Sequence, residues 1–473
     1  LCSRYLRNTH GDRHGKLYYL FERGFDRLLN GYKRGLHVVL RHQFLTLMGF
    51  LVTVAATVAL FIIIPKGFFP QQDTGFIFGF AESAQDSSSA AMNRRMLKLA
   101  EVIRDDPDVA SFGMNSSAST YNTGNFQIGL RPKSEGRTAS ADQVIRRLRP
   151  QLARVEGVNL FLQASQDINV GGRLSRTQYQ YTLTDSNLEE LNEWAPRMLA
   201  RLRQLPELAD TVSDQQNAAA TATVTIDRAR ASSFGISPAV IDATIYDAIG
   251  QRQVAQFFTQ INSYRVILEV TPALQQDPSL FNKLYLNSPV TGQQVPLSSF
   301  VTVDTTKTGY LAISHQSQFP AVTISFNLAP GVSLGQATQA IQKAQAEMGA
   351  PQTLTGAFQG TAKAFGDSLS SQPYLIAAAL IAVYIVLGVL YESYIHPLTI
   401  LSTLPSAGVG ALLILMAGGY DLSVIALIGI ILLIGIVKKN GIMMIDFALN
   451  AERQHGMTPE QAIYQACVLR FRP

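Results

Sequence analysis

The chain has 473 residues, of which 47% are hydrophobic and 15% are charged, and its formal net charge is +5. Soluble proteins average about 25% charged residues, so this composition indicates that the apolar residues are concentrated in blocks. The apolar content excludes a disordered chain, two cysteines exclude a disulfide scaffold, and seven scattered histidines exclude a Cys/His metal framework. The modest positive charge does not indicate a nucleic-acid binder.

Four blocks have the length and composition of transmembrane helices, and their predicted ranges are 44–64, 374–391, 398–418 and 422–447. A helix needs about 20 predominantly apolar residues to cross the hydrocarbon core of a bilayer. The alternative is four helices buried in one soluble core, and it would require all four to lack a polar face. We therefore predict four membrane spans. The first span starts too far along the chain to be a signal peptide.

Lysine and arginine beside the spans predict their orientation. Residues 1–43 contain nine Lys/Arg and three acidic residues, which places this segment in the cytoplasm. We expect an amphipathic helix within it. Residues 67–372 then form an exported block, and the tail 448–473 returns to the cytoplasm. In that tail, Thr458 followed by Pro459 predicts the start of a short helix.

Strand-like and helical runs alternate through the exported block. From residue 76 to residue 163 their order is β-α-β-β-α-β, the split βαβ arrangement. A second copy starts at residue 178, is interrupted after residue 227 and resumes at residue 321. The interrupting segment has a helix and a hairpin of its own, so we expect a domain inserted into the second repeat. The predicted fold class is a membrane α-helical bundle combined with an α+β exported region.

The sequence lacks the short motifs of several enzyme and cofactor classes. It has no GxxxxGK[ST] phosphate loop, no HExxH, no CxxC and no GxGxxG after a strand. We therefore expect no cofactor and no ATP-driven transport by this chain. Any energy source must act through the membrane helices.

The last span carries polar residues, namely Lys438, Lys439 and Asn440, with Asp446 further along. A cation inside a bilayer is costly and usually pairs with a counter-charge on an ion path. Alternatively, both lysines end a shorter span and extend their amines to water, which is called snorkelling. Consecutive helical residues point about 100° apart. We therefore expect one lysine to face the bundle and the other to snorkel.

Aromatic residues alternate along the first exported strand. Phe76, Phe78 and Phe80 share one of its faces, and Phe161 and Gln163 share a face of an expected neighbouring strand. In one interpretation this face packs beneath the helices as core. In the other it is an open aromatic sheet face that binds apolar ligands.

Four segments, 64–70, 175–180, 386–393 and 435–447, are long and specific enough to compare with known families. They resemble the resistance-nodulation-division (RND) transporters of the hydrophobe/amphiphile efflux type, and within these the MdtB/MdtC-like subunits. The resemblance covers essentially the whole chain. A subunit of that family is about twice as long and has twelve spans. This chain therefore resembles its second half, from the end of span six through span ten.

The resemblance implies a division of the exported block into subdomains. Residues 74–176 correspond to a first porter subdomain, and residues 177–227 with 310–362 correspond to a second. Both would have the ferredoxin-like, split βαβ fold. Residues 228–309 correspond to a docking subdomain that meets partner proteins. The cleft between the porter subdomains would be the substrate entrance.

The resemblance also implies roles for individual residues. One group falls where the family lines its substrate pathway: Phe78, Phe80, Glu82, Met114, Phe161 and Gln163. Met114 belongs to the segment 113–123, which corresponds to the family's switch loop. Lys439 matches the proton-relay lysine and Asn440 its neighbour, and this assigns Lys438 to snorkelling. The relay aspartates of the family lie on a span outside this sequence, and Asp446 is too far along the helix to replace them.

The implied function is that of an inner-membrane drug/proton antiporter subunit in a bacterial cell, with a large periplasmic portion. It would export amphiphilic compounds such as antibiotics, bile salts or detergents, using the proton gradient and no cofactor. Its implied partners are sister subunits in a homo- or heterotrimer, a periplasmic adaptor protein, an outer-membrane channel and membrane lipid. One alternative is an RND-type exporter of lipids or metal ions, and metal export is disfavoured by the Phe and Gln of the pathway. The other is a periplasmic assembly module without transport.

Overall fold

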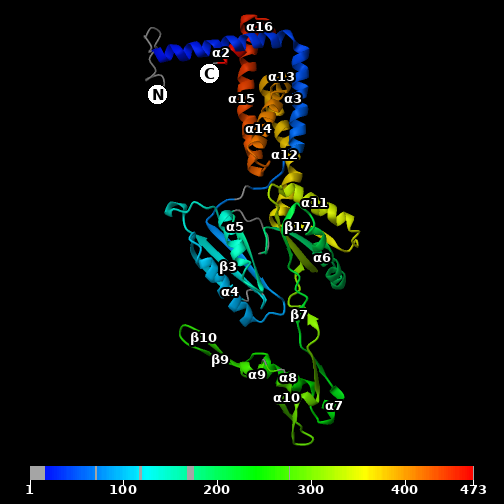
Figure 1. The fold of residues 1–473 in the computed structure, drawn as a ribbon. Coiled ribbons are helices and arrows are strands. Elements are labelled where there is room, and N and C mark those ends of the chain that lie inside the picture. The colour runs from blue at the N-terminus through cyan, green and yellow to red at the C-terminus, as the bar shows by residue number, and fades with distance from the viewer. Residues whose placement is uncertain are drawn as a thin grey trace.

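The computed structural model describes residues 16–69, 72–116, 120–167, 175–275, 277 and 279–471. A helical bundle, two α/β units side by side and a smaller distal unit follow one another along its long axis (Figure 1). The expectations for residues 1–15, and for residues 117–119 of the segment matched to the switch loop, lie outside the described residues.

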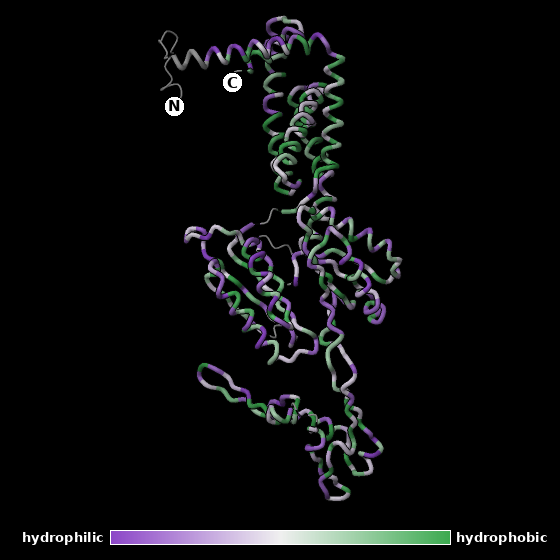
Figure 2. Tube along the Cα trace, viewed as in Figure 1, coloured by the Kyte–Doolittle hydropathy of each residue, from purple (hydrophilic) through white to green (hydrophobic). Residues whose placement is uncertain are grey.

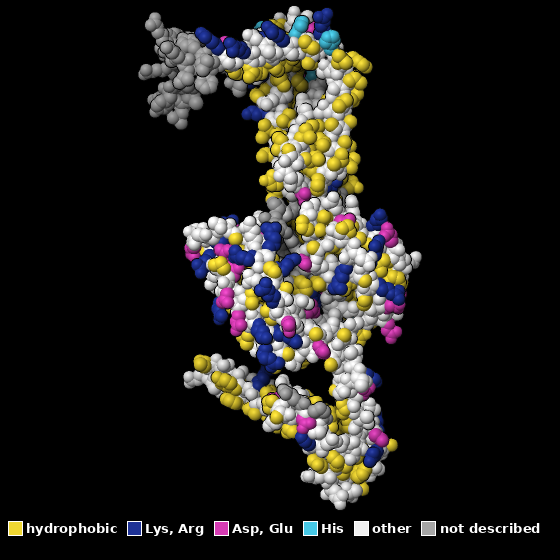
Figure 3. Space-filling model, in the orientation of Figure 1, with side chains coloured by type: hydrophobic (Ala, Val, Ile, Leu, Met, Phe, Trp, Pro, Cys, Tyr) yellow, Lys and Arg dark blue, Asp and Glu magenta, His cyan; other side chains and the backbone are white. Residues whose placement is uncertain are grey.

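The bundle consists of α3 (Gln43–Ile63), α12 (Gly360–Tyr391), α13 (Ile395–Leu401), α14 (Leu404–Ala417) and α15 (Val424–His455). The described residues include four helices long and apolar enough to cross a membrane, with α13 and α14 together forming the third. The bundle is apolar along its length, and its visible surface is a band of hydrophobic side chains (Figures 2 and 3). The prediction of four apolar helices is confirmed.

Two bundle helices extend beyond the apolar windows that predict them. α12 starts at Gly360 rather than at residue 374, because its first turns pack Ala362 and Phe365 into the core of an α/β unit. α15 continues to His455 rather than ending at residue 447. A hydropathy window detects only the apolar part of a helix. It therefore misses turns that continue into polar surroundings.

Two further helices lie at the end of the bundle away from the α/β units. α2 (Lys16–Arg41) runs across this end, and α16 (Pro459–Leu469) packs on α15 (Figure 1). The rings of Tyr32 and Phe471 stack with centroids 4.6 Å apart and join α2 to the end of the chain. The side chain of Thr458 accepts a hydrogen bond from the Gln461 amide, which confirms the predicted helix start.

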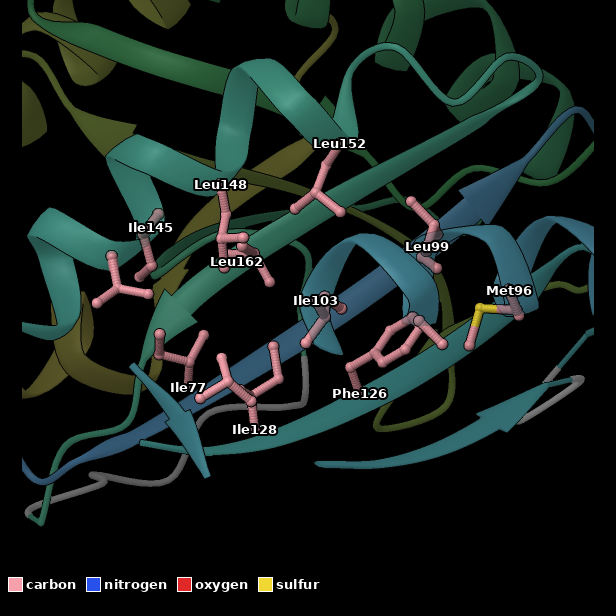
Figure 4. Packing of buried hydrophobic residues seen from close by; sticks show 14 of the residues in the cluster. Ile77, Met96, Leu99, Ile103, Phe126, Ile128, Ile145, Leu148, Leu152 and Leu162 are labelled. Atoms are coloured by element: carbon pink, nitrogen blue, oxygen red, sulfur yellow. The ribbon is translucent and has the colours of Figure 1, made fainter. Parts of the chain in front are cut away.

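The first unit is an antiparallel sheet with α4 (Ser89–Arg104) and α5 (Ala141–Leu152) on one face. Its strand order is β2-β3-β1-β4. The strands are β1 (Phe76–Ser83), β2 (Val109–Ser116), β3 (Thr123–Leu130) and β4 (Val158–Ala164). Figure 4 shows Ile77, Phe126 and Leu148 pointing into the core between the sheet and the helices.

The second unit repeats this plan. Its strands are β5 (Tyr179–Thr184), β6 (Leu208–Ser213), β16 (Phe319–Leu328) and β17 (Thr355–Gln359), with α6 (Leu188–Leu202) and α11 (Leu334–Glu347). β16 pairs with both β6 and β5, and β17 pairs with β5, which gives the order β6-β16-β5-β17. This is the order of the first unit, so the two units have the same strand topology. The short strand β15 (His315–Gln316) pairs antiparallel with the start of β16.

The distal unit interrupts the second unit between β6 and β15. It has its own buried core, which includes Ala231, Ile241, Leu297 and Phe300. Its elements are α7 (Arg228–Ser233), α8 (Pro238–Ile249), β9 (Arg252–Phe258), β10 (Ser263–Leu268), α9 (Pro272–Gln275), α10 (Leu280–Lys283), β11 (Tyr285–Asn287) and β12 (Gln294–Pro296). Two antiparallel strand pairs connect it to the second unit. They are β7 (Ala219–Ala220) with β14 (Thr308–Gly309), and β8 (Thr223–Ile226) with β13 (Val301–Asp304). An inserted unit is therefore observed, and its docking role stays a prediction.

Candidate functional site

The two faces of β1 carry different side chains. Ile77 and Ala81 point toward the helices and are 1% and 0% exposed. Phe78, Phe80 and Glu82 alternate with them and are half-buried on the opposite face. Because the buried core of the unit lies on the helix side, the structure favours an open aromatic face over the core interpretation.

The pairing of β1 with β4 gathers more of the predicted residues on this face. Phe80 is opposite Phe161, and Phe78 is opposite Gln163. Directly opposed residues of an antiparallel pair project to the same side of the sheet. We call the set Phe78, Phe80, Glu82, Phe161 and Gln163 the aromatic face. Its role in a substrate pathway stays a prediction.

Met114 is not part of the aromatic face. It lies on the edge strand β2 opposite Phe126, whose side chain is fully buried on the helix side. By register, Met114 projects to that side too, and it is 39% exposed because the strand is at the sheet edge. The resemblance groups it with the other predicted pathway residues, but the register places it on the opposite side of the sheet.

An arginine that the sequence does not single out as a site residue occupies the aromatic face. The guanidinium of Arg176 donates to both carboxylate oxygens of Glu82, at 2.5 Å from Nε and 2.6 Å from Nη2. Its Cζ atom lies 5.0 Å from the centroid of the Phe80 ring. The Arg176 side chain is 7% exposed and that of Glu82 is 21% exposed. Gln216 of the second unit donates from Nε2 to Glu82 Oε1 at 2.8 Å.

The first and second units also meet next to the aromatic face, around Gln163. Arg149 of α5 pairs with Asp210 of β6 at 2.9 Å. A cavity of about 250 Å³ lies between α5 and β4 on one side and β5 and β16 on the other, with Gln163 and Tyr179 in its wall. Burial raises the pKa of the Tyr179 hydroxyl to about 12, and the charge of Asp421 adds to the shift.

A short segment after α3 connects the bundle to the second unit, and we call residues 65–68 the membrane junction. Its carbonyl groups accept hydrogen bonds from Leu422 and Val424 at the start of α15, at 2.8 and 3.0 Å. Another of its carbonyls, that of Lys66, accepts from Gly335 of α11 at 3.1 Å. A Cβ atom on Gly67 would lie 2.8 Å from Asp421 Oδ2, so a side chain there would disturb the junction.

The two lysines of α15 have different surroundings. Lys438 is 8% exposed, whereas Lys439 and Asn440 are exposed on the outer surface of the bundle. Tyr391, at the end of α12, donates from Oη to the Ile442 carbonyl at 3.3 Å. Both lysines therefore lie within about one or two helical turns of that end of α12. The snorkelling assignment of Lys438 is not supported, because the neighbouring helices cover its side of α15. The relay role of Lys439 and Asn440 stays a prediction.

Glycines of α14 and α15 differ in their surroundings. A Cβ atom on Gly408 would lie 3.0 Å from Thr57 of α3, and Thr57 Oγ1 donates to the Pro405 carbonyl of α14 at 3.0 Å. Gly441 lies at ordinary contact distance from Ile400 and Thr403. Gly410, Gly429 and Gly435 have open space where a Cβ would be.

Across the described ranges, no group of three or more His, Cys, Asp or Glu is arranged to hold a metal ion.

A comparison of the sequence with known protein families gives a match that extends over all the elements described above. The model of the family described as AcrB/AcrD/AcrF matches residues 1–473. The match includes the bundle, both α/β units and the distal unit. It therefore applies to the arrangement as a whole and not to a single motif.

Proposed function

Since this chain belongs to the AcrB/AcrD/AcrF family of RND transporters, we propose that it is part of a proton-driven exporter of amphiphilic compounds in a bacterial inner membrane. Family membership makes it a transporter rather than an enzyme. The amphiphilic cargo, the proton gradient, the inner membrane and the MdtB/MdtC-like subtype belong to the proposal. The motif at 435–447 supports that subtype.

The aromatic face is the observation that carries the proposal. Phe78, Phe80 and Phe161 present apolar area toward a second unit, although their own unit has a complete core without them. Binding sites for small molecules are mostly apolar with a few placed polar groups. Gln163 and Glu82 supply such groups at this face. An amphiphile, with an apolar body and a polar head, matches this combination better than a metal ion does.

The energy source in this proposal acts at α15. Lys439 would be attracted by carboxylates on other membrane helices, and protonation of those carboxylates would weaken the attraction. The helices would then shift relative to one another. The membrane junction and α12 both connect the bundle to the second unit. A shift of α15 or α12 would therefore change the contact between the two α/β units.

The partners in this proposal meet the distal unit. The hairpin of β9 and β10 is exposed along its whole length, and Phe258 and Ile261 are 76% and 97% exposed. Large exposed apolar patches mark interaction sites, and an isolated hairpin is marginally stable in water. These features support sister subunits in a homo- or heterotrimer, a periplasmic adaptor and an outer-membrane channel as partners.

The test is dye efflux from cells that express the intact transporter in an efflux-deficient host. We expect lower accumulation of amphiphilic dyes than in the vector control, and a protonophore should abolish the difference. Unchanged accumulation for every amphiphile, with the protein inserted in the membrane, would contradict the proposal and favour the assembly module.

A further inference from the structure

We infer that α2 is a binding surface for anionic phospholipids, and that a row of arginines along this helix attracts them to the end of the bundle away from the α/β units. The partner is the surface of the bilayer, selected by the negative charge of its lipids. This inference goes beyond the proposed function, because it concerns the lipids around the transporter and not its cargo or its energy source.

α2 lies across the end of the bundle. A single residue, His42, separates it from α3, and the chain turns there from the crosswise direction of α2 into the bundle (Figure 1). Phe25 and Tyr32 of α2 lie against the ring of Phe471, with centroid distances of 5.6 and 4.6 Å. A helix held crosswise at the end of a membrane bundle lies parallel to the surface of the bilayer that the bundle crosses.

One face of α2 is basic, and Figure 3 shows basic side chains along this end of the molecule. We call four exposed arginines of this face the arginine row: Arg23, Arg27, Arg34 and Arg41. Their spacing of four, seven and seven residues places them within about 40° of one another around the helix. Asp26 lies at least about 60° around the helix from each of them. No ion pair of the described residues includes a member of the row, so its positive charge is available to a partner.

The face opposite the arginine row is apolar and only partly covered. Its half-buried members recur every three or four residues and are Phe25, Leu29, Tyr32 and Leu36. Leu28 and Val39 lie at the edge of this stripe and are 63% and 46% exposed. The N-terminal part of α2 also extends past the bundle (Figure 1). A basic face opposite an apolar stripe that its own protein leaves partly uncovered is typical of helices that lie in a bilayer surface.

The alternative is that the arginine row is a solvated face that binds nothing, and the dimensions of a bilayer argue against it. The headgroup layer is roughly 5–8 Å thick on each side, and a helix is about 10 Å across. Arginine side chains are long and flexible, so a row on the outer face of a helix at this depth reaches the headgroups. Each basic residue near an anionic bilayer surface favours binding by about fivefold.

The experiment measures which lipids lie beside α2 in the intact transporter, reconstituted in nanodiscs of phosphatidylcholine. Leu28→Cys carries a bimane label, and the other cysteines of the transporter are replaced by serine. A small fraction of brominated phosphatidylglycerol, or of brominated phosphatidylcholine, is then included. The initial slope of bimane quenching against mole fraction reports the local concentration of that lipid. We expect the slope for phosphatidylglycerol to be about fivefold larger than the slope for phosphatidylcholine.

Neutralising the arginine row should remove this preference. The combined variant Arg23→Gln, Arg27→Gln and Arg34→Gln should make the two slopes equal. The matched control removes the same charge from exposed positions of α4 in the first α/β unit, with Arg94→Gln, Lys98→Gln and Arg104→Gln. It should keep the fivefold ratio. Inorganic phosphate added at constant ionic strength should also leave the ratio unchanged, because the row binds lipid headgroups and not free anions.

Four results would overturn the inference. Equal slopes with the intact row would show that the arginines do not select lipids by charge, and no quenching by either lipid would show that α2 does not lie at the bilayer surface. Loss of the ratio in the α4 control would assign the effect to net charge, and loss with inorganic phosphate would assign the row to free anions. The measurement needs neither a proton gradient nor cargo, so none of these results bears on the proposed function.

Discussion

Truncation of Phe126 should mainly affect stability and truncation of Phe78 should mainly affect binding, because the two residues lie on opposite faces of one sheet. Phe126 is opposite Gly79 on the core side and is 0% exposed. Phe126→Ala should cost about 3–5 kcal/mol, the cost typical of removing a fully buried phenylalanine ring. Phe78 is one position along β1 from Gly79, on the open face. Phe78→Ala leaves no enclosed cavity and should cost only about 1 kcal/mol.

The assay is thermal unfolding of the purified transporter combined with binding of Nile red. For a unit of about 100 residues, 1 kcal/mol shifts the unfolding midpoint by roughly 4–8 °C. Phe126→Ala should therefore lower the midpoint of the first unit by more than about 10 °C and reduce the amount of folded protein. Phe78→Ala should lower it by only about 5 °C but weaken the binding of Nile red at equal protein concentration.

One result would refute the separation of the two faces. If Phe78→Ala destabilises the protein as much as Phe126→Ala and lowers export of all compounds alike, Phe78 is part of a core. The aromatic face would then have no role in binding. Phe161→Ala, on the neighbouring strand, should agree with Phe78→Ala in both measurements.

Three further perturbations have expected outcomes. Lys439→Ala should stop proton-coupled dye efflux at normal protein levels, whereas Lys438→Ala should mainly lower the amount of folded protein. Equal efflux per molecule for Lys439→Ala and wild type would exclude a proton-relay role for Lys439. Gly67→Ala should reduce efflux because its Cβ meets Asp421, and adding Asp421→Gly should restore it; no rescue would exclude this contact as the cause. Burial opposes ionisation of Asp73, but hydrogen bonds from basic neighbours hold its pKa below the ordinary value. The ionised Asp73 therefore stabilises the folded state fully above about pH 4, and this stabilisation is lost as the pH falls through the lower folded pKa. Asp73→Asn should flatten the acid side of a plot of unfolding midpoint against pH. An unchanged plot would contradict this.

The elements set by local pattern were predictable from the sequence. Alternation along β1 predicts that Phe78 and Phe80 share a face, and the order of runs predicts two split βαβ units. Ser333 also illustrates this, since its capping box with Gln336 begins α11. In each case the information lies within a few residues of the element itself.

The features set by contacts between distant segments were not predictable. The sequence cannot show that Arg176 pairs with Glu82, because the pair joins residues 94 positions apart. It gives the angle between Lys438 and Lys439 but not which one the neighbouring helices cover. The placement of Met114 depends on the irregular pairing of β2 with β3 near Val109, and this irregularity has no clear signal in the sequence.

The continuity of α12 has a mechanical consequence. This helix of 32 residues begins in the core of the second unit, contacts β5 and β17 there, and ends in the bundle at Tyr391. At 1.5 Å per residue it is a rod about 48 Å long, so a tilt of about 10° displaces one end relative to the other by about 8 Å. Pro373 removes one backbone hydrogen bond within the rod and offers a place to bend. As a lever arm, the rod would enlarge a small rotation among the membrane helices into a displacement wider than an aromatic ring within the second unit.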